Sequence, residues 1–427
     1  MTGLSPRLKA RATGYAWYVL MLLTVINTVN YFDRTMVYGM YEPMRQRYAL
    51  TDGQIGMLTF VFFMVHGLTT LPFGWVADHF DRRKVIAFGV IVWSLATFGT
   101  AHALGFWTLL LMRGLVGVGE AAYGPVSNSL LAETFPPEQK ARTLGIYNAG
   151  MFVGACLGLL AGVRLGWPLA FHVIAVPGVL LGLITLVLKV PARRVDTGKV
   201  KLGAMKQVLV EGWRSLRPRT LRWMLIAGIA VSFTAGGYIT WFADFIRVVH
   251  GVTAEQATTH LFLIVVTAGP LGVIAGGLFA DKLHVKHRDG RVIAIAAGFA
   301  IGVPAAVGTI YLPYGPGWYV CAWILNFALP FYHGPMAAVI DDVVDDDKAS
   351  TAQATFSALL HLIGTGAGGF VVGVLNGPLG HRGAMMVPTV MIAVAIPFCL
   401  IARRFVGSDT DAKHARVAAT AAAAAQR

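Results

Sequence analysis

Several ionisable residues stand inside apolar runs of this chain, and three of them are the first candidates for chemistry. Arg113 and Glu120 interrupt a run that is otherwise apolar from Phe106 to Leu131, and Asp33 lies inside an earlier run. On a helix, positions 113 and 120 share one face, with a rise of about 10 Å between them. Because a bilayer penalises each charge by several kcal/mol, we expect this face to point into a polar cavity. The alternative is a buried ion pair that only fixes helix packing.

The depth of these charges predicts their pairing. Asp33 and Arg113 each lie about seven residues from the outer end of their span, roughly 10 Å into the membrane, and Glu120 lies two turns deeper. We therefore expect an ion pair between Asp33 and Arg113, and a Glu120 carboxylate that lacks a close cation and is suited to carry a proton. These three residues are the predicted proton-coupling group. Arg34, about 100° around the helix from Asp33, is expected to meet either the anionic head of a substrate or a neighbouring helix.

The composition indicates which elements must position these charges. Of the 427 residues, 56% are apolar and only 13% are charged, which is typical of a membrane protein. The net charge of +14 is spread over short stretches between apolar runs, so a nucleic-acid partner is not expected. Cys156, Cys321 and Cys399 lie in apolar runs without ligand spacing. They predict no disulfide and no metal site, and we expect no cofactor.

Apolar runs long enough to cross a bilayer of about 30 Å occur twelve times. An even number of spans places both termini on one side. That side holds 28 of the 35 Lys and Arg residues, and the opposite loops hold five. By the positive-inside rule, both termini are predicted to be cytoplasmic, in a multi-pass protein of the inner membrane. The runs lie at 16–40, 53–77, 85–104, 106–132, 143–165, 168–188, 221–246, 256–280, 292–312, 317–340, 352–378 and 383–402.

The sequence thus predicts an all-α membrane protein with twelve transmembrane helices in two six-helix bundles. The basic segment between the bundles is expected to be an amphipathic helix on the membrane surface or a flexible tether. Gly74 to Asp78 resembles Gly277 to Asp281, which indicates a parallel duplication. The predicted boundaries are a cytoplasmic N-terminus at 1–15, an N-terminal bundle at 16–189, a cytoplasmic linker at 190–220, a C-terminal bundle at 221–405 and a disordered cytoplasmic tail at 406–427.

A charged loop follows the second apolar run, with the sequence Gly74-Trp-Val-Ala-Asp78-His-Phe-Asp81-Arg82-Arg83-Lys84. Together with twelve spans and the duplication, it resembles the loop signature of the major facilitator superfamily, although His79 and Asp81 stand where Arg and Gly are commoner. The resemblance implies that this loop stabilises the outward-open state together with an acid at the inner end of span four and an arginine at the start of span five. The residues at these places are Gly74, Asp78, Arg82, Arg83, Glu133 and Arg142. Simple positive-inside charge is the alternative for the two loop arginines.

Three further stretches resemble one branch of that superfamily, the Spinster transporters. They are Asn30-Tyr31-Phe32-Asp33-Arg34, Arg113-x-x-x-Gly117-x-Gly119-Glu120-Ala121 and Gly150-x-x-x-Gly154-x-x-x-Gly158. The resemblance implies a monomer that moves a sphingoid phosphate or lysophospholipid by proton-coupled alternating access. The organic anion:cation symporters share the first two stretches, so a small organic anion symporter of the same fold is the alternative. A passive lipid scramblase or sensor is a further alternative.

Aromatic residues of the second half predict a cavity wall suited to the apolar tail of an amphiphile. Packing in the core or against lipid is the alternative for each aromatic, and a hydrogen-bonded packing role is the alternative for His66, His333 and His361. An enzyme is not expected, because the chain has no His-Glu-x-x-His, Gly-x-Ser-x-Gly or P-loop pattern. The predicted substrate-binding residues are Arg34, Tyr31, Tyr123, Trp241, Phe331, Tyr332 and His333.

Overall fold

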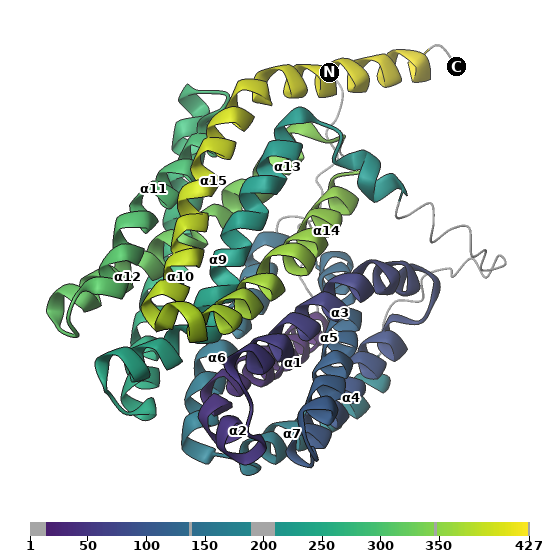
Figure 1. Ribbon diagram of the computed structural model, residues 1–427. Helices are drawn as coiled ribbons and strands as arrows, with labels where there is room; N and C mark the ends of the chain where they lie inside the picture. The colour runs from purple at the N-terminus through teal and green to yellow at the C-terminus, as the bar shows by residue number, and fades with distance from the viewer. Residues whose placement is uncertain (1–13, 136–138, 189–209, 346–347, 426–427) are drawn as a thin grey trace.

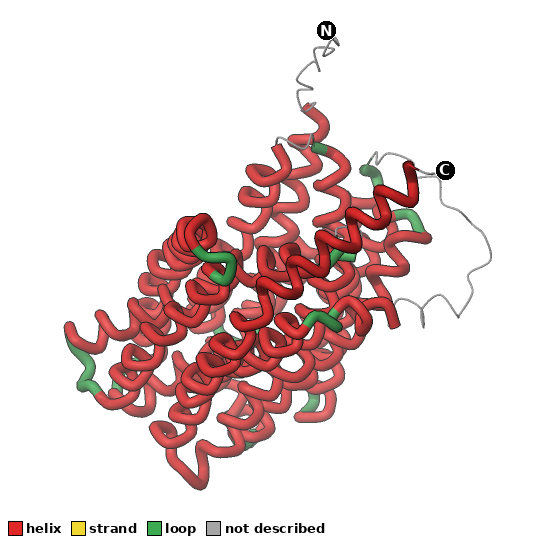
Figure 2. Tube along the Cα trace, turned by 90° about the horizontal axis from the view of Figure 1, so that it is seen from above, coloured by secondary structure: helices red, strands yellow, loops and turns green. Residues whose placement is uncertain are grey.

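Helices make up nearly all of the described chain. The computed structural model describes residues 14–135, 139–188, 210–345 and 348–425, and within these ranges it contains no strand (Figure 2). Nine helices in these ranges are long and apolar enough to cross a membrane. The all-α fold predicted from the apolar runs is confirmed.

The helices coincide with the twelve predicted spans. In the first half they are α1 (Gly14–Met36), η1 (Val37–Met40), α2 (Tyr41–Tyr48), α3 (Asp52–His79), α4 (Arg82–Ala101), α5 (Phe106–Thr134), α6 (Lys140–Leu165) and α7 (Leu169–Leu186). In the second half they are α9 (Arg219–His250), α10 (Ala254–Lys286), α11 (Gly290–Tyr311), α12 (Pro316–Ala328), η3 (Leu329–Tyr332), α13 (His333–Val343), α14 (Ala349–Leu359), η4 (Leu360–Thr365) and α15 (Gly366–Ala425). The tenth span is α12, η3 and α13 in succession. Gly380, at φ 65°, divides α15 into the eleventh and twelfth spans.

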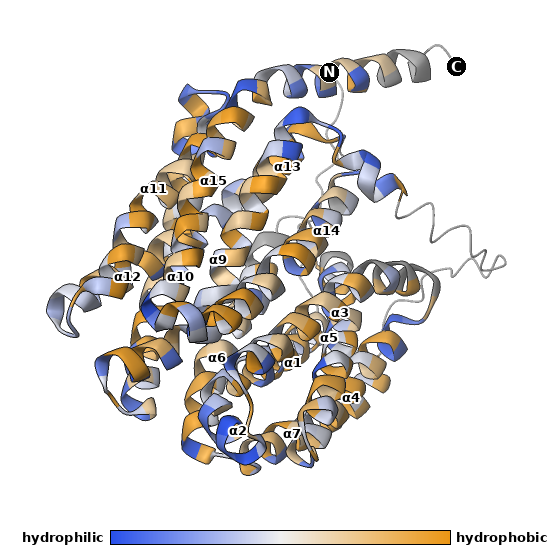
Figure 3. Cartoon of the chain, viewed as in Figure 1, coloured by the Kyte–Doolittle hydropathy of each residue, from blue (hydrophilic) through white to orange (hydrophobic). Residues whose placement is uncertain are grey.

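The two halves form separate bundles that meet along α3, α6, α10 and the η4–α15 segment (Figure 1). Both described chain ends lie at one end of the molecule, which we call the terminal end, and α2 lies at the opposite end, which we call the distal end. Apolar residues cover the middle of the helices, whereas hydrophilic residues gather at the two ends (Figure 3). This distribution is expected for helices that cross a bilayer.

Capping residues fix corresponding helix starts in the two halves. Thr51 caps α3, with Gln54 completing a reciprocal capping box, and Thr253 with Gln256 does the same for α10. Each box satisfies backbone N–H groups that would otherwise lack partners at the helix end. The same device at the second helix of each half supports the duplication inferred from the sequence.

Glycines set the closest helix contacts around the predicted proton-coupling group. A Cβ at Gly154 of α6 would lie 2.1 Å from the Thr28 carbonyl oxygen of α1, and a Cβ at Gly119 of α5 would lie 2.6 Å from the Gly89 carbonyl oxygen of α4. Only glycine allows backbones to approach this closely. The glycine stretch in α6 therefore positions the part of α1 that carries Asp33 and Arg34.

The C-terminal segment differs from the prediction. The segment 406–427 was expected to be disordered, but α15 continues as a helix to Ala425. Its polar residues make ionic contacts with neighbouring segments: Arg403 with Asp289, and Asp411 with Arg288. The Asp409 carboxylate also accepts a 2.7 Å hydrogen bond from the Thr220 backbone N–H at the start of α9. Alanine-rich sequence has high helix propensity, and these contacts anchor it.

Candidate functional site

Arg34 of α1 and Glu120 of α5 form a buried ion pair at the centre of the first bundle. The Arg34 Nε donates to Glu120 Oε2 at 3.0 Å, and a second guanidinium nitrogen bonds the same oxygen. The Arg34 side chain is 10% exposed and the Glu120 side chain is fully buried. Of the two roles considered for Arg34, contact with a neighbouring helix is the one present in this structure.

This pairing corrects the depth estimate made from sequence. The predicted end of the first span was residue 40, but η1 and α2 extend the helical segment to Tyr48. Arg34 lies 14 residues before Tyr48, and Glu120 lies 14 residues after Phe106, the distal end of α5. Both charges therefore lie roughly 20 Å from the distal end. Equal depth on adjacent helices explains why Glu120 pairs with Arg34.

The predicted ion pair between Asp33 and Arg113 is absent from this structure. Asp33, 1% exposed, accepts a hydrogen bond from the Thr97 hydroxyl of α4 through Oδ2, while its Oδ1 has no hydrogen-bond partner. Arg113 is 3% exposed and forms no ion pair within the described ranges. Its guanidinium carbon lies 4.8 Å from the centroid of the Phe62 ring, a cation–π contact. Arg113 lies nearer the distal end than Glu120, which separates it from the pair.

Aromatic and histidine rings connect this cluster to the second bundle. Arg34 lies over the rings of Tyr31 and Phe62, at 4.7 and 5.2 Å. On α3, the Phe63 ring stacks on His361 at 5.5 Å, and the His66 ring meets the edge of His361 at 5.6 Å. His361 lies in η4, a six-residue π-helical segment. Such segments interrupt α-helices frequently at functional sites.

Five charged residues at the distal end join the two bundles, and no motif indicates them beyond their place near helix ends. We call Glu42, Arg45, Asp52, Asp244 and Arg247 the distal ion network. Arg45 of α2 contacts Asp244 of α9 at 3.2 Å, and Arg247 of α9 contacts Glu42 of α2 at 3.0 Å. Arg45 also pairs with Asp52 of α3 at 2.6 Å. The network holds the two bundles together at this end.

An aromatic layer lies directly inside the distal ion network. The rings of Tyr41 and Trp241, from opposite bundles, are 5.6 Å apart, and those of Phe60 and Phe370 are 5.7 Å apart. The indole N–H of Trp241 donates to the Gly369 carbonyl at 2.7 Å. The structure therefore places Trp241, a predicted substrate-binding residue, in the contact that joins the bundles at the distal end.

The other predicted substrate-binding residues separate into two groups. The Tyr123 hydroxyl donates to the Leu23 carbonyl at 2.6 Å, and Phe331 packs against Phe279 and Phe327. Both are buried packing residues, and packing is the alternative that was weighed for Phe331. Tyr332 is buried and stacks on His333 at 4.4 Å, whereas His333 is exposed. Tyr31 lies under Arg34 in the central charge cluster, and His333 is the exposed member of the predicted set.

The loop signature is described only in part. The side chains of Asp78, Glu133 and Arg142 and the surroundings of Gly74 lie outside the described part, so the predicted gating role of these residues stays a prediction. Arg82 is 6% exposed at the start of α4. Arg83 hydrogen-bonds the Asp81 carboxylate at 2.6 Å and the Leu188 carbonyl at 2.9 Å. These Arg83 bonds hold the pKa of Asp81 below its usual range.

The second half contains a charge group like the one predicted for the first. Asp281, which corresponds to Asp78, lies 3.9 Å from Arg291 at the start of α11. Arg291 also pairs with Asp342 at the end of α13. Under the alignment of the Gly-Pro pairs, Asp342 lies one residue from the counterpart of Glu133. An acid, a basic residue and a second acid therefore link three helix ends in the second bundle.

Comparisons with known proteins agree with this fold. A family model described as the Major Facilitator Superfamily matches residues 23–368. Two solved structures of a bacterial homolog to the human lysosomal transporter Spinster cover 93% of this chain and 99% of their own. The inward-facing, occupied form has a TM-score of 0.80 at 23% identity, and the inward-facing, unoccupied form has 0.81 at 24%. At these identities the likeness concerns the fold.

Curated relatives indicate which branch of the superfamily this chain resembles. Human protein spinster homolog 1 is 28% identical over 402 residues, which cover 88% of this chain and 74% of the relative. The mouse sphingosine-1-phosphate transporter SPNS2 is 26% identical over 381 residues, which cover 83% and 69%. The chain belongs to the Major Facilitator Superfamily and is a multi-pass membrane transporter. Within the superfamily these curated relatives are Spinster proteins, which confirms the resemblance carried by the motifs in α1, α5 and α6.

Proposed function

We propose that this transporter moves an amphiphilic, lipid-like anion of the sphingoid phosphate or lysophospholipid class, driven by protons and by alternating access. The observation that carries the proposal is the buried Arg34–Glu120 pair beside Arg113, which forms no ion pair with any described residue. In such an arrangement the Glu120 carboxylate and an anionic head group compete for the Arg34 guanidinium, and a proton on Glu120 decides the competition in favour of the head group. That competition is the physical basis of coupling.

Each residue of the cluster has a role in this scheme. A proton on Glu120 removes the charge that holds Arg34, and the freed guanidinium binds the substrate's phosphate, because arginine matches phosphate geometry with two parallel hydrogen bonds. Arg113 serves as the counter-ion for whichever anion occupies the site. Asp33 exchanges protons with Glu120, and Thr97 steadies it between exchanges. Release of the substrate returns Arg34 to Glu120 and expels the proton.

The lipid-like character of the substrate rests on relatives and on chemistry. The mouse relative is named a sphingosine-1-phosphate transporter, and its substrate has a phosphate head and an apolar tail. In this chain two arginines offer a site for the head. Half-buried aromatic residues of the second bundle, with Trp323 and Phe327 stacked at 5.4 Å, offer a surface for the tail. We propose that the protein functions as a monomer, because the two halves supply the two walls.

The proposed orientation places the terminal end in the cytoplasm, in the inner membrane. The support is the excess of Lys and Arg there, 28 of 35. The distal ion network would then close the outer side, leaving an inward-facing state. The loop with Asp78, Arg82, Arg83, Glu133 and Arg142 would close the inner side in the alternate state, as the group of Asp281, Arg291 and Asp342 suggests by analogy.

Uptake into proteoliposomes tests this function. The wild type, Glu120→Gln and a control, Arg164→Gln, are reconstituted and given labelled sphingosine phosphate or lysophosphatidylcholine with and without an imposed proton gradient. We expect Glu120→Gln to lose gradient-driven uptake by at least about tenfold in protein that still folds and reconstitutes, although its unfolding temperature falls because Arg34 is left buried without its partner. The control should behave as wild type, because Arg164 and its partner Glu255 are 54% and 60% exposed.

Other outcomes would overturn specific parts of the proposal. Full gradient-driven uptake by Glu120→Gln would remove the proton role. Uptake that is unchanged when the gradient is collapsed would favour a passive scramblase. Thermal stabilisation by small carboxylates alone, with none from the two lipids, would assign the chain to organic anion symport.

A further inference from the structure

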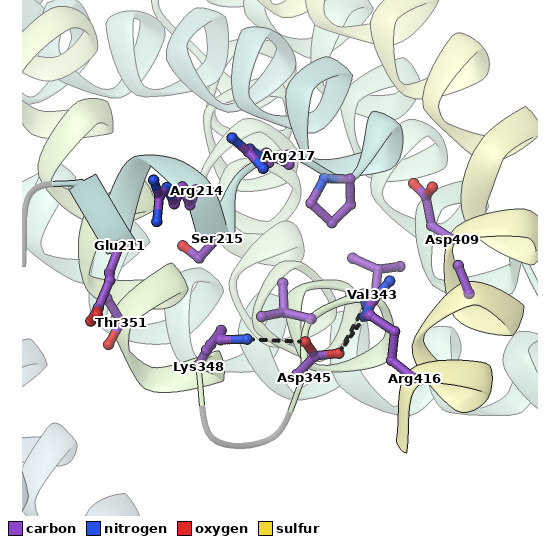
Figure 4. Close-up of a pocket in the computed structure, with 13 residues that line it drawn as sticks. Glu211, Arg214, Ser215, Arg217, Val343, Asp345, Lys348, Thr351, Asp409 and Arg416 are labelled. Carbon is purple, nitrogen blue, oxygen red and sulfur yellow. Dashed lines mark hydrogen bonds and ion pairs between the residues drawn. The ribbon is translucent and has the colours of Figure 1, made fainter. Parts of the chain in front are cut away.

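A hollow of ≈ 740 Å³ lies at the terminal end, outside the membrane-spanning part of the second bundle (Figure 4). Four segments distant in sequence line it: the short helix at 210–215, the end of α13, the start of α14 and the extension of α15. A volume of this size suits a small ligand, since such sites commonly measure about 300–1,000 Å³. The hollow is separate from the central charge cluster.

The anionic side chains that line the hollow are largely satisfied by nearby groups. Asp345 pairs with Lys348 at 3.4 Å and with Arg416 at 2.9 Å. Asp409 accepts the hydrogen bond from the Thr220 backbone N–H at 2.7 Å. Glu211 stands at the edge and forms no ion pair with any described residue.

Two arginines of the lining have no such partner. Within the described ranges, the side chains of Arg214 and Arg217 form no ion pair and no hydrogen bond, and both are exposed. Figure 4 draws both from the linker side of the hollow, across from Asp345 and Lys348. Pro218, which precedes the first residue of the 32-residue helix α9, also lines it. The start of a helix adds a partial positive charge to the two arginines.

Exposed apolar side chains locate the hollow beside the membrane surface. On the short helix, Trp213 is 66% exposed and Val210 is 37% exposed. Trp is enriched where the headgroups of a bilayer begin, because its ring is apolar and its N–H is polar. Gly212 of the same helix packs against Thr355 of α14, so the helix is fixed to the second bundle.

We propose that this hollow binds a phosphate-bearing anion, held by Arg214 and Arg217, which secures the end of the linker to α14 and α15. Its ligand is either a phospholipid headgroup of the adjacent leaflet or a soluble phosphate ester. The site depends on the proposed function only for its placement at the cytoplasmic face. Binding at this site is measurable without transport, so failure of one does not imply failure of the other.

The experiment measures binding to the full-length protein in a neutral detergent. The probes are dihexanoyl phosphatidylglycerol, dihexanoyl phosphatidylcholine and glycerol 3-phosphate, titrated while the unfolding temperature and intrinsic tryptophan fluorescence are recorded. The test variant is Arg214→Gln with Arg217→Gln. The matched control is Arg222→Gln with Arg404→Gln, which removes two exposed arginines of the same end that do not line the hollow.

We expect the wild type and the control to bind phosphatidylglycerol equally, and the test variant to bind it at least about tenfold more weakly. Binding of glycerol 3-phosphate with the same dependence on the two arginines would support the site and assign its ligand to the soluble phosphate esters. Equal losses in the test and control variants would overturn the proposal, because they would indicate unspecific attraction. If neither phosphatidylglycerol nor glycerol 3-phosphate binds, the proposal is overturned as well. Equal affinity for phosphatidylcholine that does not depend on the two arginines would also overturn it.

Discussion

Arg34 and Glu120 form an ion pair between α1 and α5 although 86 residues separate them in the chain. The pair leaves Asp33 with the Thr97 hydroxyl and Arg113 with the face of Phe62. Asp33 and Arg113 have opposite charges but do not pair with each other, and they stand beside Arg34 and Glu120, which do pair. This asymmetry gives a site that an added anion or proton can rearrange.

The first prediction concerns how much the Arg34–Glu120 pair contributes to the free energy of unfolding. Arg34→Gln leaves the Glu120 carboxylate buried without a cation, so we expect it to lower the free energy of unfolding by about 3–5 kcal/mol. Adding Glu120→Gln should restore most of the loss, because the buried charge is then removed. Thermal unfolding of the purified variants measures both effects. If the double variant is no more stable than Arg34→Gln alone, Arg34 contributes to stability through contacts other than its ion pair with Glu120.

A second prediction concerns the distal ion network. Asp244→Asn removes the carboxylate that contacts both Arg45 and Arg247, so the distal end should open more often. A single cysteine at Thr59, which is 3% exposed and hydrogen-bonded to Tyr41, reports opening by its labelling with a thiol reagent. We expect labelling to accelerate at least about fivefold, the factor for roughly 1 kcal/mol of lost contact.

The background for this measurement lacks Cys156, Cys321 and Cys399. Arg164→Gln, which breaks the exposed contact with Glu255 between the same two bundles, is the control and should change the labelling rate little. Equal acceleration by both variants would mean that any lost interbundle charge opens the protein.

A third prediction tests the contact between α1 and α6. Gly154→Val places side-chain atoms where a Cβ alone would already lie 2.1 Å from the Thr28 carbonyl oxygen. We expect a loss of at least about 2 kcal/mol in stability and a loss of transport, because α1 must shift with its two charges. Gly145→Val on the same helix has no atom within 4 Å of the added Cβ and should be tolerated. Comparable unfolding temperatures for the two variants would refute this reading of the contact.

A fourth prediction gives the pH dependence of one contact outside the membrane. Hydrogen bonds and charges of Arg416 and Lys348 outweigh the partial burial of Asp345 and lower its pKa. A lowered folded-state pKa contributes stability above the unfolded value of about 3.9 and loses it as the pH falls through the folded value. Because both cations are at least half exposed, the contribution is at most about 1 kcal/mol.

The corresponding measurement compares the wild type with Asp345→Asn. The difference in unfolding temperature should be the same at pH 7 and pH 5 and should shrink only below about pH 4. A difference that disappears between pH 7 and pH 5 would point to a different titrating group.

The class of this protein follows from its amino-acid sequence alone. Apolar runs of membrane-crossing length predict helices, because backbone groups inside a bilayer must form their hydrogen bonds within the segment. The observed helix bounds fall within a few residues of the runs, except where helices extend past them. The glycine stretch in α6 and the charges in α1 and α5 carried the Spinster resemblance.

The pairing of the charges, in contrast, depends on how the helices pack together. The sequence placed the end of the first span at residue 40, and the helical continuation to Tyr48 shifted Arg34 to the depth of Glu120. It likewise gave no sign that Arg45 would meet Asp244, 199 residues away, or that Trp241 would close the distal end. Such contacts depend on where two helices end and which faces they turn to each other. Periodicity defines a face within one helix, whereas its partner is chosen by the packing of the whole bundle.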